Sequence, residues 1–97
     1  MSEDAGRDNE LAERRAEIHE VDRAIIELLA RRVVIGRQIG KLKRDAGLPV
    51  LDPGREAEVI RAVGEMARAQ TLPSEPVREI FWRIVALSRQ VQWEEDA

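Results

Sequence analysis

The sequence predicts an all-α fold, with one very long N-terminal helix and two shorter helices per chain in an intertwined homodimeric bundle. Over residues 9–46, apolar residues recur at steps of three, four or seven, and no proline interrupts them. Two breaks that contain proline follow, at residues 47–51 and 70–73. No stretch alternates as a half-buried strand would, and the chain offers few aromatic residues for a β-sandwich core.

The length of the first helix predicts the homodimer. At about 1.5 Å per residue, a helix over residues 9–46 would be roughly 55 Å long, more than the rest of one small chain can cover. A second copy of the chain is therefore expected to bury its apolar stripe. The residues of this stripe are Leu11, Ile18, Val21, Ile25, Leu28, Ile35, Ile39 and Leu42.

Capping signals predict the two shorter helices. Asp52 followed by Pro53 is typical of an N-cap and a first helical residue, and it predicts a helix that runs to about Ala69. Ser74 is the expected N-cap of a third helix that ends near Trp93. The inward-facing residues of the second helix are expected to be Ile60, Val63 and Ala67.

One helical domain is expected over residues 9–93, between a flexible tail at residues 1–8 and a flexible acidic tail at residues 94–97. The first residues are polar and lead into no apolar segment of the signal-peptide kind. No run approaches the roughly 20 apolar residues that a membrane span needs. We therefore expect a cytoplasmic location and no membrane partner.

The composition argues against several classes of function. Sixteen lysines and arginines against nineteen acids give a net charge of −3, without the positive excess that nucleic-acid binding requires. With no cysteine and one histidine, the chain has no disulfide frame and almost no ligands for zinc. Any basic site must therefore be local.

Arg32 interrupts the apolar stripe of the first helix. It must reach solvent, pair with an acid or meet an anionic ligand, because a desolvated and unpaired charge is costly. Lys43 lies three helical turns further on and about 20° away, so both cations share one face. Gly36 and Gly40 between them carry no side chain and are expected to leave space for a small anion. Either cation alone could simply be solvated.

Arg15 adds a third cation only if two chains meet. It lies about 25 Å before Arg32 along the helix and roughly 100° around it, too far to reach the same small ligand. If the long helices of two chains pack antiparallel, the partner's Arg15 arrives near Arg32 and Lys43 and creates two equivalent sites. Alone, Arg15 would be a solvated surface residue, so only the combination favours a functional interpretation.

Two further groups of polar residues fit such a site. Asp52 and Glu56 have a structural explanation, as an N-cap and a first-turn acid favoured by the helix dipole. Ser88 and Gln92 stand four residues apart on an otherwise apolar stripe, where polar groups need partners. A ligand would satisfy their hydrogen bonds, and so would a water molecule or a contact between helices.

The spacing of these residues resembles the active site of the AroQ-class, all-helical chorismate mutases. The resemblance covers about residues 10–92 and includes the Asp52-x-x-Arg55-Glu56 turn. It implies an isomerase without metal or cofactor, which rearranges chorismate to prephenate in the biosynthesis of phenylalanine and tyrosine. The matching residues are Arg15, Arg32, Lys43, Asp52, Arg55, Glu56, Ser88 and Gln92.

The resemblance also implies roles at the reacting end of the substrate. Arg32 and the partner's Arg15 would bind the two carboxylates, with Ser88 assisting at one of them. Lys43 and Gln92 would hydrogen-bond the ether oxygen, where charge develops as the C–O bond breaks.

At the other end, the resemblance implies that Asp52 and Glu56 hold the ring hydroxyl. Arg55 would steady these acids and approach a carboxylate. The apolar walls of the site would be Ile39 and Val85.

Three alternatives share this fold: an isochorismate pyruvate lyase, a mutase for an amino analogue of chorismate, and a non-catalytic dimerisation or regulatory module. The acid pair Asp52 and Glu56 favours chorismate, because it suits a ring hydroxyl. Arg32 in an apolar stripe argues against a pure scaffold, which has no need of it. Docking to another enzyme of the aromatic pathway stays open.

Overall fold

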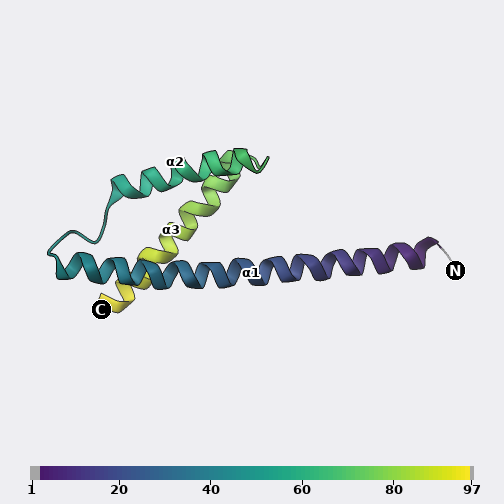
Figure 1. The fold of residues 1–97 in the computed structure, drawn as a ribbon, viewed down its shortest axis with the longest axis horizontal. Coiled ribbons are helices and arrows are strands. Elements are labelled where there is room, and N and C mark those ends of the chain that lie inside the picture. Colours follow the sequence, from purple (N-terminus) through teal and green to yellow (C-terminus); the bar gives the residue numbers. More distant parts are fainter. Residues whose placement is uncertain (1–2, 97) are drawn as a thin grey trace. The chain divides into compact units, whose positions relative to one another are not determined.

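Three helices make up the described part of the chain (Figure 1). The computed structural model describes residues 3–96, with the side chains of residues 3–92. Helix α1 spans Glu3–Asp45, α2 spans Pro53–Ala69 and α3 spans Ser74–Asp96. Every regular element among these residues is a helix, which confirms the predicted all-α fold class.

Helix α1 begins earlier than the apolar pattern predicted. Residues 3–8 continue the helix beyond the first apolar stripe residue, and acidic Glu3 and Asp4 in the first turn suit the positive end of the helix dipole. Gly47 closes the other end, with a φ of 70°, a left-handed conformation that glycine adopts without steric cost. The amides of Gly47 and Leu48 bond to the carbonyl oxygens of Arg44 and Lys43, at 3.1 and 2.8 Å.

Helices α2 and α3 start close to the predicted residues. Asp52 caps α2, because its Oδ1 accepts a hydrogen bond from the Arg55 amide at 3.0 Å, and Pro53 is the first helical residue. Ser74 is the first helical residue of α3 and not the preceding cap, since the Val77 amide already donates to the carbonyl of Pro73. The α3 backbone continues to Asp96, beyond the end predicted near Trp93.

The end of α2 repeats the left-handed closure without glycine. Thr71 has a φ of 60°, and its amide and that of Leu72 bond to the carbonyls of Arg68 and Ala67. A side chain with a β-branch is strained in this conformation, because its Cβ approaches the backbone carbonyl. The α2–α3 turn therefore stores strain that the α1–α2 turn avoids.

The chain divides into two compact units, residues 1–31 and 32–97. In the first unit, the predicted apolar stripe is exposed, with Leu11 at 47% and Leu28 at 61% of their full accessibility. Exposed leucines on one helix face are typical of a surface that another protein chain covers. Across the described residues, no helix combines the length and the apolar character needed to cross a bilayer.

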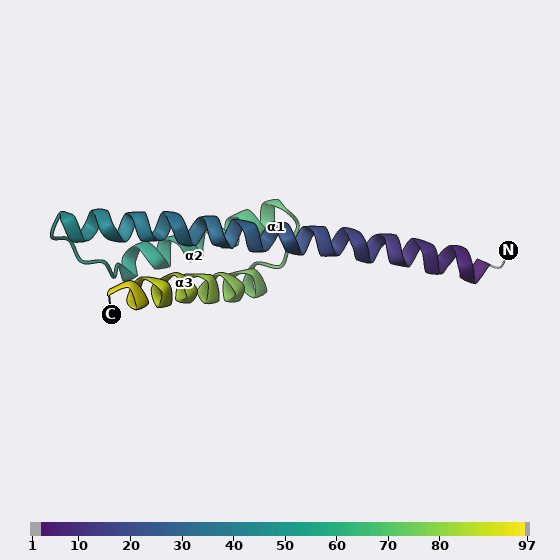
Figure 2. The ribbon, with the colours of Figure 1, turned by 90° about the horizontal axis from the view of Figure 1, so that it is seen from below.

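The core of the second unit lies between α2 and α3, which pack against each other. Figure 2 shows α2 running back from the end of α1 and α3 returning in the direction of α1. The predicted inward face of α2 is confirmed. Its residues Ile60, Val63 and Ala67 are buried, as is Val85 of α3.

Replacing Thr71 by glycine is expected to stabilise the protein by about 1 kcal/mol, because it removes the left-handed strain at the end of α2. Urea denaturation measures the change. Gly47→Ala is the matched control at the equivalent position of α1, where a Cβ atom would have no neighbour within 4 Å. Its free energy of unfolding should fall by a similar amount. Equal stability of Thr71→Gly and the unsubstituted chain would show that Thr71 is not strained.

Candidate functional site

A cavity of about 310 Å³ lies among residues of α1, α2 and α3 in the second unit. This volume falls in the range of small-molecule sites. It is lined by seven of the residues predicted for a binding site, namely Arg32, Ile39, Arg55, Glu56, Val85, Ser88 and Gln92. Its other lining residues are Ile35, Gly36, Val50, Val59 and Arg89.

Arg32 finds a neutral partner in this cavity. Its Nη1 donates a hydrogen bond to Ser88 Oγ at 2.8 Å, and Ser88 Oγ in turn lies 3.3 Å from the carbonyl oxygen of Ile84. Both Arg32 and Ser88 are half-buried. Because a hydroxyl carries no charge, this contact orients the guanidinium without neutralising it, and leaves its charge available to an anion.

Gln92 forms the second contact between α3 and α1. Its Nε2 donates to the carbonyl oxygen of Gly36 at 2.9 Å. This pair and the Arg32–Ser88 pair are each 56 residues apart, so the two helices run parallel with one turn between the contacts. The alternative of an inter-helix hydrogen bond, left open for Ser88 and Gln92, is therefore what the structure shows for both.

The space beside Gly36 and Gly40 differs from the prediction. A Cβ atom at Gly36 would lie 3.7 Å from Gln92 Nε2, and one at Gly40 would lie 3.6 Å from the same atom. The two glycines were expected to leave room for a small anion, whereas the Gln92 amide lies against them. They fix a donor at the edge of the cavity, and only Gly36 lines it.

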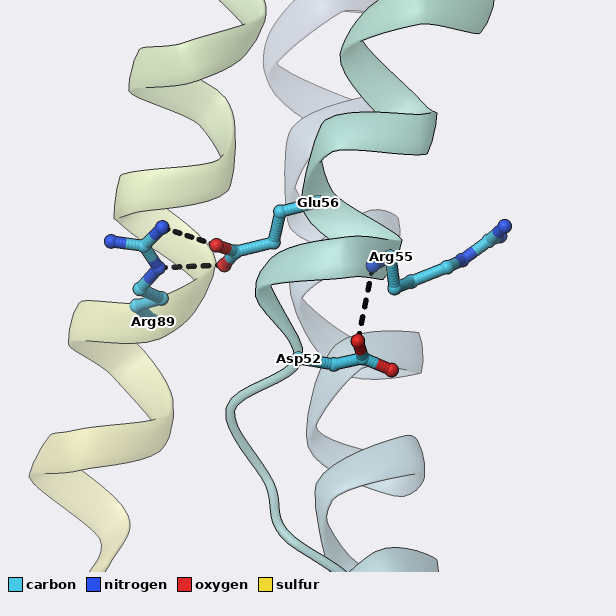
Figure 3. A network of polar contacts seen from close by, with 4 residues as sticks. All are labelled: Asp52, Arg55, Glu56 and Arg89. Atoms are coloured by element: carbon cyan, nitrogen blue, oxygen red, sulfur yellow. Dashed lines mark hydrogen bonds and ion pairs between the residues drawn. The ribbon is translucent and has the colours of Figure 1, made fainter.

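Glu56 is held by Arg89, which was not among the predicted site residues (Figure 3). Arg89 Nε donates to Glu56 Oε2 at 2.6 Å, and Arg89 Nη2 donates to Glu56 Oε1. These bonds join α3 to α2, and hydrogen bonding to Glu56 raises the pKa of the Arg89 guanidinium. The Glu56 side chain is only 16% exposed, against 49% for Arg89.

Arg55 does not pair with Glu56, as Figure 3 shows. Its backbone amide bonds to Asp52, while its guanidinium Nη1 lies 3.2 Å from Glu58 Oε2. The Arg55 guanidinium therefore contacts Glu58, and the bond to Asp52 is the backbone bond of the α2 cap. Arg89 takes the expected place of Arg55 at Glu56.

Lys43 and Asp52 line a neighbouring hollow and not the main cavity. Lys43 Nζ lies 3.5 Å from the carbonyl oxygen of Val50, and Val50 itself lines the cavity. Asp52 is exposed and acts as the cap of α2, which was its structural explanation. Both residues stand beside the cavity wall without forming it.

Arg15 lies on α1 within the first unit and is exposed. The cavity described above belongs to the second unit alone, where three arginines outnumber the one glutamate. The cavity is therefore locally positive in a chain whose net charge is −3. Among the described residues, no three histidine, aspartate or glutamate side chains are grouped to hold a metal ion.

A sequence profile of the family described as "Chorismate mutase type II" matches residues 14–93. The chain belongs to this family. The match includes every residue proposed above for the site, and it leaves residues 3–13 of α1 outside.

Individual proteins and a solved structure agree with this membership. A chorismate mutase from Methanocaldococcus jannaschii is 26% identical over 84% of this chain and 83% of its own length. A solved chorismate mutase structure (form II) from Thermus thermophilus has a TM-score of 0.76 and 30% identity, over 86% of this chain and 93% of that chain. A 3-dehydroquinate dehydratase from Pyrobaculum aerophilum is 36% identical over 74% of this chain. The chain spans 20% of the length of the first curated relatives it matches, the dehydratase included.

In this member of the chorismate mutase type II family, the sequence itself contains a signal for Arg89. Val85, Ser88, Arg89 and Gln92 follow the i, i+3, i+4, i+7 pattern of one helix face. Val85 is 5% exposed, and the three polar residues continue its stripe along the cavity. An arginine inside such a stripe is the same kind of signal that singled out Arg32.

The place of Gln92 over the glycines can be tested at Gly36. Gly36→Ala should keep or slightly raise the melting temperature, because its methyl group meets Nε2 at ordinary contact distance and alanine favours the helix. Gly36→Leu should displace the amide, and the Gln92 side-chain NH₂ resonances in ¹⁵N NMR spectra should shift. Gly6, which has no neighbour within 4 Å, provides the control substitutions. Unchanged Gln92 resonances in Gly36→Leu would contradict the contact.

Proposed function

We propose that this chain is a chorismate mutase, which converts chorismate to prephenate by an intramolecular Claisen rearrangement. The observation that carries the proposal is a positive cavity with one acid and two neutral hydrogen-bonding side chains, within the residues that match the family. Chorismate is a small dianion with a ring hydroxyl and an ether oxygen, so each type of group has a complement in this set.

The reaction needs no nucleophile from the protein. It is accelerated by holding the substrate in its compact chair-like conformer and by stabilising the charge that develops on the ether oxygen. Fixed cations and a neutral amide donor do both without being consumed. The Arg32–Ser88 bond and the Gln92–Gly36 bond support the proposal, because they orient two of these donors before substrate enters.

In the proposed complex, Arg32 binds one substrate carboxylate with Ser88 beside it. Gln92 hydrogen-bonds the ether oxygen through the N–H that Gly36 does not occupy. Lys43 joins Gln92 there, which requires its Nζ to leave the carbonyl oxygen of Val50. The 3.5 Å length of that bond makes it weak, and a lysine side chain is flexible enough to turn toward the cavity.

Glu56 accepts the hydrogen bond of the ring hydroxyl in this complex, with Asp52 approaching from the start of α2. Arg55 lies at the cavity near these acids. Ile39 and Val85 supply apolar walls, and both line the cavity.

We further propose that the enzyme is an intertwined homodimer in which the partner's Arg15 completes each site. The exposed apolar stripe of the first unit supports the dimer, because exposed apolar residues on one helix face are buried when a second helix covers them. A two-fold arrangement would make both sites equivalent.

The direct test of the activity is to follow the loss of chorismate absorbance with purified protein and to identify the product by NMR. Prephenate is expected, whereas a protein that leaves chorismate unchanged and releases pyruvate when given isochorismate would be a lyase. Arg32→Met should lower kcat/KM about a hundredfold, because it removes a charge-assisted bond to the substrate but keeps the length of the side chain. Arg83→Gln, on exposed α3 surface outside the cavity, is the control and should have normal kcat/KM.

The shared site can be tested by mixing two inactive variants. Arg15→Ala and Arg32→Ala chains, unfolded together in equal amounts and refolded, should recover about a quarter of wild-type activity, since half the dimers are mixed and each has one intact site. Each variant refolded alone is the control. No recovery in the mixture, with dimers present by light scattering, would mean that Arg15 does not act across an interface.

A further inference from the structure

We propose that Arg89 is a positioning residue, which holds Glu56 as a fixed acceptor for the ring hydroxyl and thereby sets the preference for a hydroxylated substrate. The inference rests on the proposed function, because it assigns a role within the same cavity. It concerns substrate recognition and not the bond-breaking step.

The geometry of the pair supports this role. Arg89 approaches Glu56 with two parallel N–H groups, one to each carboxylate oxygen, and such a fork restricts rotation of the carboxylate far more than a single bond does (Figure 3). The two residues come from different helices and both line the cavity. The carboxylate is therefore fixed at the cavity surface.

The pair leaves Glu56 able to bind a substrate hydroxyl. An ionised carboxylate offers about four lone-pair sites, and the Arg89 fork uses one on each oxygen. The remaining sites can accept the proton of a ring hydroxyl. A substrate without that hydroxyl would cover the acceptor without pairing it, which is costly for a carboxylate that is only 16% exposed.

Charge compensation is a second effect of Arg89. An unpaired carboxylate at the cavity wall would repel the carboxylates of a dianion. Arg89 offsets this repulsion whether or not the substrate carries a hydroxyl. The two effects can be separated, because only the positioning effect depends on the hydroxyl.

The test compares binding of two dicarboxylate transition-state analogues, identical except for the ring hydroxyl, by isothermal titration calorimetry. In the unsubstituted protein, the hydroxylated analogue should bind more tightly. Arg89→Gln should reduce the affinity ratio of the hydroxylated to the deoxy analogue about tenfold. The change in affinity for the deoxy analogue measures the loss of charge compensation alone. Arg89→Lys keeps the charge but not the fork, so it should restore binding of the deoxy analogue without restoring the ratio.

Matched variants complete the design. Arg83→Gln removes an arginine from the same helix outside the cavity and should leave the ratio unchanged. In a Glu56→Gln background, Arg89→Gln should change the ratio little, because the acceptor it positions is already altered. With chorismate as substrate, Arg89→Gln should raise KM about tenfold and change kcat less than threefold.

The outcomes separate the possible failures. If Arg89 only joins α2 to α3, its loss should weaken both analogues equally and lower the melting temperature, and the inference would be overturned. If the unsubstituted protein turns over chorismate, but Arg89→Gln has the wild-type affinity ratio for the two analogues and the wild-type KM, the inference is overturned and the proposed function stands. If the unsubstituted protein neither consumes chorismate nor binds either analogue, the proposed function fails together with the inference.

Discussion

The parallel contact between α3 and the last part of α1 is the constraint on which the site depends. Two hydrogen bonds one turn apart, Arg32 to Ser88 and Gln92 to Gly36, set the register of the two helices. The contact leaves room for a methyl group at most at positions 36 and 40, because an added Cβ there would already lie 3.7 and 3.6 Å from the Gln92 amide nitrogen. Two glycines inside a helix lower its intrinsic stability by about 1 kcal/mol each relative to alanine. Here they allow a polar side chain to lie against the backbone of another helix and turn its amide toward a cavity.

The charges around the cavity are arranged so that each has one defined neighbour. Arg32 contacts a neutral hydroxyl and keeps its full charge for an anion, whereas Arg89 is committed to Glu56. Glu56 is mostly buried, and a buried carboxylate without a partner would be costly. The Arg89–Glu56 pair lowers the free-energy cost of burying this carboxylate, and it also holds the carboxylate in one orientation. Stability and substrate recognition therefore rest on the same contact.

The sequence predicted the helices more fully than the site. The start of α2 at Pro53, the break after α1 at residues 47–51 and the buried face of α2 were all predicted, and the structure confirms them. The early start of α1 was not predicted, because residues 3–8 carry no apolar repeat, and the strained end of α2 at Thr71 was not, because no glycine marks it. Most predicted site residues line one cavity, whereas Lys43 and Asp52 line the hollow beside it.

By itself, the sequence determined the all-α class, the Asp52 cap of α2 and the set of polar residues that interrupt apolar faces. These features depend on neighbours within one or two helical turns, so spacing alone is enough to find them. Only the tertiary structure decided which polar groups meet. Glu56 and Arg89 are 33 residues apart, and Gly36 and Gln92 are 56 apart, so each pairing depends on how helices pack. Local rules contain no information about a contact of that separation, because the loops between the helices leave register and orientation to the packing of side chains.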